Sequence, residues 1–292
     1  MDFHMYADDT QLYKSVPANQ IDGLLSDAST CILAVKDWML ANKLKLNDDK
    51  TEIILCCPPH KRQAIVQFSS IVIGAHSLPI SQDAKTLGVY LDSTISMKKQ
   101  LNCMCQSLFL ELRRISQLMP YLTLPAAKKL VSASFMSRLD YCNATLYGLP
   151  KYQINRLQRL QNCAARIILK QKKGCHVTPL LFELHWLPVH LRINYKLATM
   201  CYRYFENTVP SYISDLLLPY EPSRDLRSKD KMLLCVPKAR LKTVGNRAFT
   251  YAGPTVWNAL DLNLRKSVSL EQFKEKLKTN YFSKYFCDCF AV

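Results

Sequence analysis

The first fifteen residues show the period-two pattern that is typical of β-strands. Residues 3–7 and 10–14 each alternate along an extended chain, and Asp8 and Asp9 lie between the two runs. Alternation interrupted by two residues that tolerate turn geometry predicts a β-hairpin with both carboxylates at its tip. Because adjacent carboxylates repel each other, an exposed tip gains from binding a hard divalent cation, and oxygen ligands suit Mg²⁺. A solvated turn without a ligand is the alternative.

The following residues predict one long helix and several short strands. Apolar residues recur at helical spacing over residues 21–44, which predicts a helix that covers one face of a sheet. Residues 51–57 are a candidate buried strand, stopped by two prolines. Residues 71–80 predict a second hairpin around a Gly-Ala-His-Ser turn. Residues 85–92 predict a single strand with Gly88 inside it, where a backbone can come close to a partner.

Beyond residue 95 the pattern is helical. Ser269 and Gln272 have capping-box spacing ahead of one such helix, and residues 210–231 are rich in Pro, Ser and charge, which predicts a linker. Apolar spacing of three and four residues predicts further helices over residues 101–118, 125–138, 154–173 and 190–205. The expected fold class is therefore α+β, with short strands first and helices afterwards.

Composition limits the class of protein. The chain has 292 residues, of which 49% are hydrophobic, enough for one large domain or two ordinary ones. It contains no apolar run of about 20 residues, so no transmembrane segment is expected. Met1 is not followed by a basic stretch and an apolar core, so no secretory signal is expected either. An intracellular location, in the nucleus or cytoplasm, follows, with the 12 cysteines as reduced thiols.

Positive charge is concentrated in the second part of the chain. Residues 1–100 carry 10 Lys and Arg against 11 Asp and Glu, whereas residues 101–292 carry 29 against 12, a net charge of +17. This asymmetry indicates a polyanionic partner, with a merely basic, soluble surface as the alternative. The clearest basic face is expected on the helix over 154–173, where five cations follow helical steps: Arg156, Arg159, Arg166, Lys170 and Lys173. Like charges in line destabilise a helix unless an anion lies against them, although a solvated face is the alternative.

The string Tyr6-Ala7-Asp8-Asp9-Thr10-Gln11-Leu12-Tyr13 resembles the Tyr-x-Asp-Asp hairpin of reverse transcriptases, in the form found in LINE-type (non-LTR, jockey-like) retrotransposons. The resemblance implies that the hairpin belongs to a partial polymerase palm. It also implies that Asp8 ligates a catalytic Mg²⁺, with Asp9 beside it.

Two later blocks extend the resemblance. Residues 38–52 are similar to the block after the catalytic hairpin, which puts the role of general acid to the pyrophosphate leaving group on Lys50. Residues 87–92 resemble the primer-grip strand, which implies that Gly88 and Tyr90 lie close to a primer. A surface Lys at a turn and a plain edge strand are the alternatives.

The resemblance covers nearly the whole chain and implies three regions, a palm over 1–97, a helical thumb over 98–147 and a mostly helical basic region over 148–292. Candidate contacts of the thumb with a nucleic-acid backbone are Lys98, Lys99, Arg113, Arg114, Lys128 and Lys129. Blocks at 138–143, 157–166, 185–189 and 253–260 resemble the region after the polymerase core, although no chemistry is assigned to them. Asp261 departs from the family, where a Pro is expected.

The function implied is RNA-directed DNA polymerisation, with an RNA template, a DNA primer, dNTP substrates and two Mg²⁺ ions. Two-metal phosphoryl transfer needs carboxylates that hold ions about 3.5–4 Å apart, and in the family one essential Asp comes from a strand before the hairpin. The sequence starts just before Tyr6, and Asp83 and Asp92 follow the hairpin. The expectation is therefore a fragment that is inactive alone. The alternatives are a basic nucleic-acid-binding fragment without catalysis, or a relic of a truncated element without function.

Overall fold

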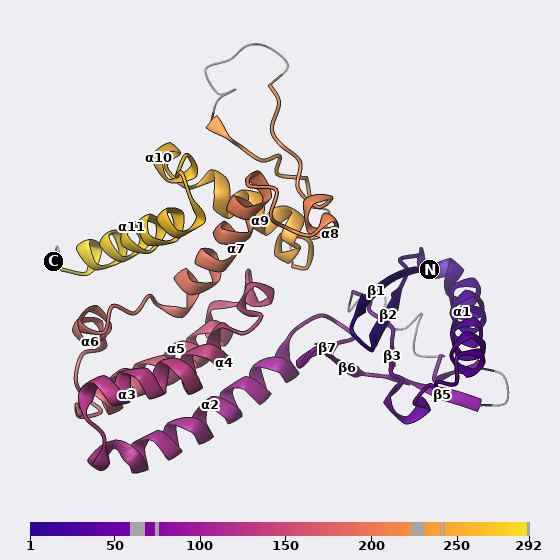
Figure 1. Ribbon diagram of the computed structural model, residues 1–292, viewed down its shortest axis with the longest axis horizontal. Helices are drawn as coiled ribbons and strands as arrows, with labels where there is room; N and C mark the ends of the chain where they lie inside the picture. Colours follow the sequence, from indigo (N-terminus) through magenta and orange to yellow (C-terminus); the bar gives the residue numbers. More distant parts are fainter. Residues whose placement is uncertain (59–67, 74–75, 223–230, 240, 242, 291–292) are drawn as a thin grey trace. The chain divides into compact units, whose positions relative to one another are not determined.

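The computed structural model describes residues 1–58, 68–73, 76–222, 231–239, 241 and 243–290. It has an α+β fold, in which small sheets and hairpins are followed by about ten helices (Figure 1). The chain divides into two compact units, Met1–Gln100 and Leu101–Val292. All of the described strands lie in the first unit, and most of the helices lie in the second. The fold class expected from the sequence is thus confirmed at this level.

The expected N-terminal hairpin is present. Strands β1 (Asp2–Tyr6) and β2 (Asp9–Tyr13) pair antiparallel, with Tyr6 opposite Asp9. A two-residue loop, Ala7-Asp8, therefore connects them. Ala7 has a φ of 53°, the left-handed conformation that tight hairpin loops require at a central position. The backbone thus projects the Asp pair at one end of a short two-stranded ribbon.

Helix α1 covers a three-stranded sheet, as the sequence predicts. It spans Ile21–Ala41, and the sheet has the order β3 (Ile53–Ile54), β5 (His76–Ser81), β4 (Ser70–Ile73). The hydroxyl of Ser29 on α1 donates to the carbonyl of Val72 on β4, at 2.8 Å. Strands β4 and β5 form the second expected hairpin, although its loop residues 74–75 lie outside the described residues.

The expected buried strand over residues 51–57 is wrong. Only Ile53 and Ile54 form a strand, at the edge of the sheet and half-buried. The flanking residues bond elsewhere, because the Glu52 carboxylate accepts a hydrogen bond from the Lys85 N–H at 2.9 Å and the Cys57 N–H donates to the carbonyl of Ser93, also at 2.9 Å. The segment therefore joins two sheets instead of extending one.

The single strand expected over residues 85–92 is a hairpin instead. Strands β6 (Asp83–Thr86) and β7 (Val89–Asp92) pair antiparallel with Thr86 opposite Val89. Leu87 and Gly88 form the loop, with φ values of 46° and 81°. Two successive positive φ angles define a type I′ turn, and Gly adopts them without steric cost. Gly88 therefore lies in a turn and not within a strand.

Helix α2 (Lys98–Leu118) leads into the second unit. It is followed by a helical segment that combines α-helical and π-helical turns. The helix expected over 125–138 consists of α3 (Leu124–Val131), one wider π-helical turn over Ser132–Met136, and α4 (Ser137–Asp140). The hydroxyls of Ser134 and Ser137 donate to carbonyls one turn back. Such bonds compete with the regular helical ladder, which accounts for the local widening.

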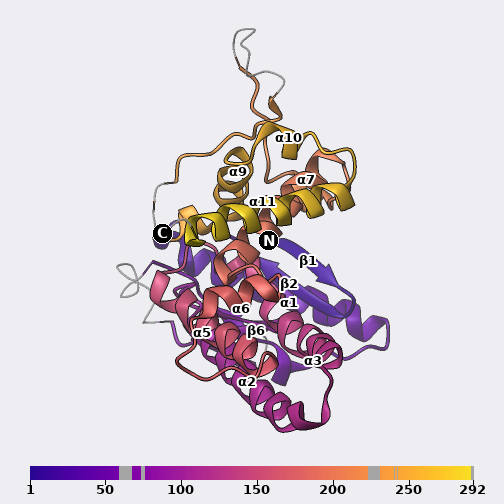
Figure 2. The same ribbon diagram turned by 90° about the vertical axis from the view of Figure 1, so that its left-hand side faces the viewer.

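Helices α7, α9 and α11 form the core of the second unit (Figures 1 and 2). Ser269 caps α11 as expected, because its hydroxyl accepts a hydrogen bond from the Gln272 N–H at 3.2 Å. The bounds of these and the smaller helices are α5 Lys151–Ile168, α6 Val177–Glu183, α7 Val189–Phe205, α8 Ser211–Ser214, α9 Phe249–Asn258, α10 Leu262–Arg265 and α11 Leu270–Phe290. In the linker expected over 210–231, α8 is a short helix, and residues 223–230 lie outside the described part.

No helix among the described residues is long and apolar enough to cross a membrane.

Burial of two titratable groups in this core predicts a loss of stability in alkaline solution. Burial raises the pKa of the Cys201 thiol to about 12 and also raises the pKa of Tyr281. An unfolded chain loses these protons at about pH 8.5 and 10. The stabilisation is therefore complete below about pH 8.5 and is lost as the pH rises toward the folded values.

Urea unfolding at increasing pH should show this decline. In the Cys201→Ala chain, the fall in unfolding free energy above about pH 8.5 should be shallower than in the unchanged chain. Cys287, whose thiol is exposed, provides an internal control for native thiol labelling. Native labelling of Cys201 as fast as that of Cys287 would contradict this burial.

Candidate metal site and basic surface

The Asp pair is exposed at the tip of the first hairpin. Asp8 occupies the second loop position and Asp9 is the first residue of β2. Both residues are exposed, and their oxygens are accessible to a hydrated cation. Among the described residues, however, no group of three or more His, Cys, Asp or Glu side chains is placed to hold a metal ion. The pair thus offers two carboxylates of the kind that Mg²⁺ prefers, without a third from the described part of the chain.

Two side chains fix this hairpin to its neighbours. The Gln11 amide donates a hydrogen bond to the hydroxyl of Thr86 on β6. On the other side, the Lys14 ammonium contacts the Asp27 carboxylate on α1 at 2.6 Å. This hydrogen bond lowers the pKa of Asp27. Gln11 is two residues from Asp9 and Thr86 is two residues from Gly88, so the structure brings the hairpin of the Asp pair next to the hairpin that contains Gly88.

Tyr90 is flanked by cations at the second of these hairpins. The Lys99 ammonium lies 4.7 Å from the centroid of the Tyr90 ring, and the Lys85 ammonium lies 5.5 Å from it. Lys99 also pairs with the carboxylate of Asp83. The Tyr90 N–H donates to the Gln100 side chain at 3.0 Å, so this backbone group has a partner within the unit. The cluster combines an aromatic ring with two positive charges, of which one is neutralised.

Asp92 stabilises the chain locally. Its carboxylate accepts hydrogen bonds from the backbone N–H groups and the hydroxyls of Thr94 and Ser96, at 2.7–3.2 Å. Burial alone would raise the pKa of Asp92, but these hydrogen bonds outweigh it and the pKa is lowered. With Asp83 paired to Lys99, Asp83 and Asp92 both have structural partners.

Lys50 ends a short 3₁₀ turn, Asp48–Lys50, in which its N–H donates to the Asn47 carbonyl at 3.1 Å. Its side chain is exposed. Within the described residues its ammonium makes no ion pair, so the structure does not join Lys50 to the Asp pair by a direct contact.

The candidate basic residues on α2 and α3 differ in their surroundings. Arg114 is 71% exposed and lies 3.6 Å from the carboxylate of Glu111, one turn earlier. Arg113 is exposed and makes no ion pair with any described residue. Of the remaining candidates, Lys98 and Lys129 are exposed and Lys128 is half-buried. These side chains bring cations to the surface without forming one continuous row.

The expected line of five cations on α5 is only partly correct. The helix ends at Ile168, and Lys170 follows with a φ of 52°, so Lys170 and Lys173 lie beyond it. Arg166 is half-buried and donates two hydrogen bonds to the Cys175 carbonyl, at 3.0 and 3.3 Å. A half-buried guanidinium that already caps a carbonyl has fewer N–H groups left for a phosphate. Of the five residues, Arg156 and Arg159 are the ones that are exposed on the helix.

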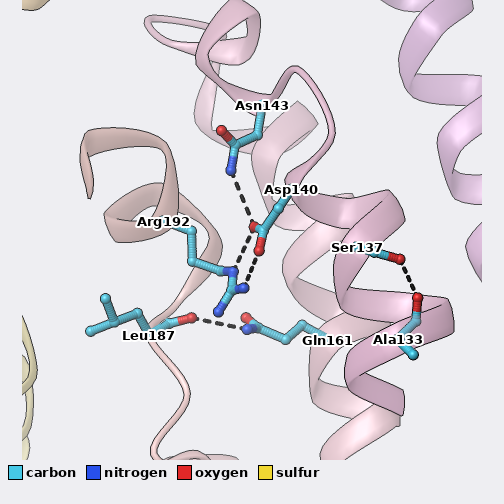
Figure 3. A network of polar contacts seen from close by, with 7 residues as sticks. All are labelled: Ala133, Ser137, Asp140, Asn143, Gln161, Leu187 and Arg192. Carbon is cyan, nitrogen blue, oxygen red and sulfur yellow. Dashed lines mark hydrogen bonds and ion pairs between the residues drawn. The ribbon is translucent and has the colours of Figure 1, made fainter. Parts of the chain in front are cut away.

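The blocks of sequence without assigned chemistry meet in the second unit. The Arg192 guanidinium donates to both oxygens of the Asp140 carboxylate, at 2.8 Å for Nε, and Asn143 donates to the same carboxylate at 3.2 Å (Figure 3). The buried Gln161 amide donates to the Leu187 carbonyl at 2.9 Å (Figure 3). These residues position the helices. The Gln161–Leu187 and Asp140–Arg192 partners are 26 and 52 residues apart, so local spacing could not predict these two contacts.

Trp257 and Asn258 on α9 form a clamp that holds the segment containing Met232 and Leu234. The Trp257 indole N–H donates to the Met232 carbonyl at 2.6 Å. The Asn258 side chain accepts from the Leu234 N–H at 3.0 Å and donates to the Leu234 carbonyl at 2.8 Å. The segment also forms one isolated bridge, between Pro219 and Leu234. The Tyr220 N–H donates to the Leu233 carbonyl at 2.9 Å, and the Cys235 N–H donates to the Leu218 carbonyl at 2.8 Å.

A cavity of about 560 Å³ lies in the second unit between α5, α6 and α7. Its polar lining includes Asn155, Asn194 and His190. Burial, with a smaller effect of the Lys151 charge, lowers the pKa of His190, so its ring is neutral at physiological pH.

No family model, no curated protein and no solved structure matches the chain. Function must therefore be inferred from the chain's own residues and their geometry.

Proposed function

We propose that the chain is part of the reverse transcriptase of a LINE-type (non-LTR, jockey-like) retrotransposon, acting inside the cell, in the nucleus or cytoplasm. Residues 1–97 would supply part of the palm, residues 98–147 the thumb and residues 148–292 a basic C-terminal region. The single observation that supports this proposal best is the Asp8-Asp9 pair. The resembling octapeptide folds as a two-residue-loop hairpin with both carboxylates exposed, as a metal-binding tip requires.

In this proposal Asp8 ligates a catalytic Mg²⁺ and Asp9 lies beside it. The ions would activate the primer 3′-hydroxyl and stabilise the leaving group during template-directed nucleotide addition from a dNTP. Since the described residues place no third acidic ligand near the pair, we propose that a carboxylate from elsewhere completes the site. The chain alone is then inactive as an RNA-directed DNA polymerase. Lys50 remains the candidate general acid, although it has no direct contact with the pair.

Nucleic-acid binding without catalysis is the second candidate function. The net charge of +17 over residues 101–292 favours it. Neutralisation of phosphates by Lys and Arg gives binding that is independent of sequence and weakens steeply with salt. The Tyr90 ring between Lys85 and Lys99 offers a surface of the kind on which a base or sugar packs. An RNA template paired with a DNA primer is the expected ligand.

Primer extension on an RNA template with Mg²⁺ tests both candidates. We expect no nucleotide incorporation by the chain alone, and we expect salt-sensitive retention of the template–primer duplex. The Asp8→Ala chain is compared with an Asp22→Ala chain, which loses an exposed carboxylate on α1 instead. Retention should be unchanged in both, because neither carboxylate binds phosphate.

Each outcome has a definite meaning. Incorporation that vanishes in Asp8→Ala but persists in Asp22→Ala would show that the metal site is complete within the chain, against the proposed inactivity. Absence of both incorporation and retention would contradict both candidate functions and favour a relic of a truncated element.

A further inference from the structure

Two arginines converge on one buried carboxylate in the second unit. Arg114 of α2 and Arg138 of α4 lie 3.6 and 3.3 Å from the same Glu111 oxygen, Oε2. The Glu111 side chain is 10% exposed, whereas the two arginine side chains are 71% and 47% exposed. The carboxylate is therefore covered, and the guanidinium groups present their remaining N–H donors to solvent.

A hollow of about 320 Å³ opens directly over these donors. Its lining consists of both arginines together with Cys103, Gln106, Ser107 and the apolar Leu110. These α2 residues follow steps of three and four, so they share one face of the helix. No acidic residue is part of the lining, and Glu111 lies behind it. The hollow therefore has a positive potential, although the Glu111 carboxylate balances one of the two arginine charges.

The hydroxyl of Ser107 extends the set of donors. Arg138 Nη1 donates to the Ser107 oxygen at 3.1 Å. Because that oxygen accepts from the arginine, its own proton is left to donate to a ligand in the hollow. Two guanidinium groups and a hydroxyl around one space match the oxygens of a phosphate group, which accepts several hydrogen bonds at once. Glu111 holds the arginines in place before a ligand arrives, which reduces the entropy lost on binding.

We propose that this hollow, formed by Arg114, Arg138 and Ser107, binds one phosphate group of a nucleic-acid strand. The proposal rests on the nucleic-acid binding proposed above and names a specific contact point. Arg138 was not among the candidate binding residues named from the sequence. Arg113, which is adjacent to Arg114 in sequence, does not line the hollow. The surface thus contains one organised phosphate site among scattered cations.

The test compares the salt dependence with which five chains bind an RNA–DNA duplex: the unchanged chain, Arg114→Gln, Arg138→Gln, the double variant of these two, and the control Lys278→Gln. Loss of one phosphate contact should reduce the slope of log affinity against log salt by about 0.9, or about eightfold in affinity at 0.1 M salt. Lys278→Gln, which removes one exposed charge from α11 and is not among the candidate binding residues, should keep the original slope. The double variant Arg114→Gln/Arg138→Gln should lose little more than either single variant, because both serve one phosphate.

Circular dichroism checks the fold of each variant. If Arg138→Gln fails to fold, the comparison of Arg114→Gln with the control variant decides the test, because Arg114 is exposed. Equal losses in all three single variants would overturn the specific site and leave general nucleic-acid binding intact. Absence of duplex binding by the unchanged chain would overturn both the specific site and general nucleic-acid binding.

A separate experiment titrates inorganic phosphate while the side-chain N–H signals of Arg114 and Arg138 are followed by NMR. Shifts there, without any effect of the variants on duplex binding, would show a free-anion site only and overturn the proposal.

Discussion

The Trp257→Ala chain is expected to lose about 3–5 kcal/mol of stability in the second unit, the cost typical of removing a fully buried large aromatic side chain. Trp257 is fully buried. Its ring lies 5.2 Å from that of Phe205 and 5.9 Å from that of Phe273, and Tyr202 stacks on Phe273 at 4.4 Å. The substitution removes the centre of this aromatic cluster, which joins α7, α9 and α11.

The loss has a polar component that a second variant separates. Trp257→Phe keeps most of the packing but leaves the Met232 carbonyl without its indole donor, at a cost of about 1–3 kcal/mol. Tyr121→Ala serves as the control, because that ring is 85% exposed. Urea unfolding followed by near-ultraviolet circular dichroism measures all three. Equal effects of Trp257→Ala and Tyr121→Ala would contradict the proposed role of this cluster.

The Asp140→Ala chain is expected to lose about 2–3 kcal/mol. The substitution leaves the Arg192 guanidinium, whose side chain is 21% exposed, without its two-pronged partner. Removing one member of a buried pair costs about 3–5 kcal/mol, and the 38% exposure of Asp140 reduces that figure through solvent screening. Asn143 loses an acceptor in the same step.

A double-mutant cycle with Arg192→Ala isolates the interaction. The double variant should be less destabilised than the sum of the two single variants, since removing both charges leaves none unpaired. Lys284→Ala provides a comparison, because the Lys284–Asp261 pair is about 60% exposed on both sides and should contribute about 0–1 kcal/mol. Strict additivity of Asp140→Ala and Arg192→Ala would contradict a direct contribution of this pair.

Local patterns were sufficient to predict the parts of the fold that depend on neighbouring residues. The hairpin around Asp8 was predicted because a period of two and a two-residue turn are both local signals. Helix α7 was predicted in nearly its full length because its apolar residues recur at helical spacing. The hairpin at Gly88 was missed because Leu87, a residue that seldom adopts positive φ, occupies the first turn position and hides the turn signal.

The remaining differences come from contacts between residues far apart in sequence. Helix α5 was expected to continue to Lys173, but it ends at Ile168 and Arg166 then bonds to the Cys175 carbonyl. The third carboxylate of a metal site and the Arg114–Glu111–Arg138 cluster likewise depend on tertiary arrangement, because Arg138 and Glu111 are on different helices. Spacing alone carries no information about such pairs.

The clamp formed by Trp257 and Asn258 has a consequence for how this region can diverge among related chains. Both side chains bond only to main-chain atoms of Met232 and Leu234. The anchoring is therefore indifferent to which side chains the clamped segment carries. Leu233, which is only half-buried, is free to vary over evolutionary time. Met232 has a left-handed φ of 48°, which restricts the residue types that fit, and the buried Leu234 is limited by its volume. A tryptophan–asparagine pair can thus persist while the segment that it holds changes beyond recognition.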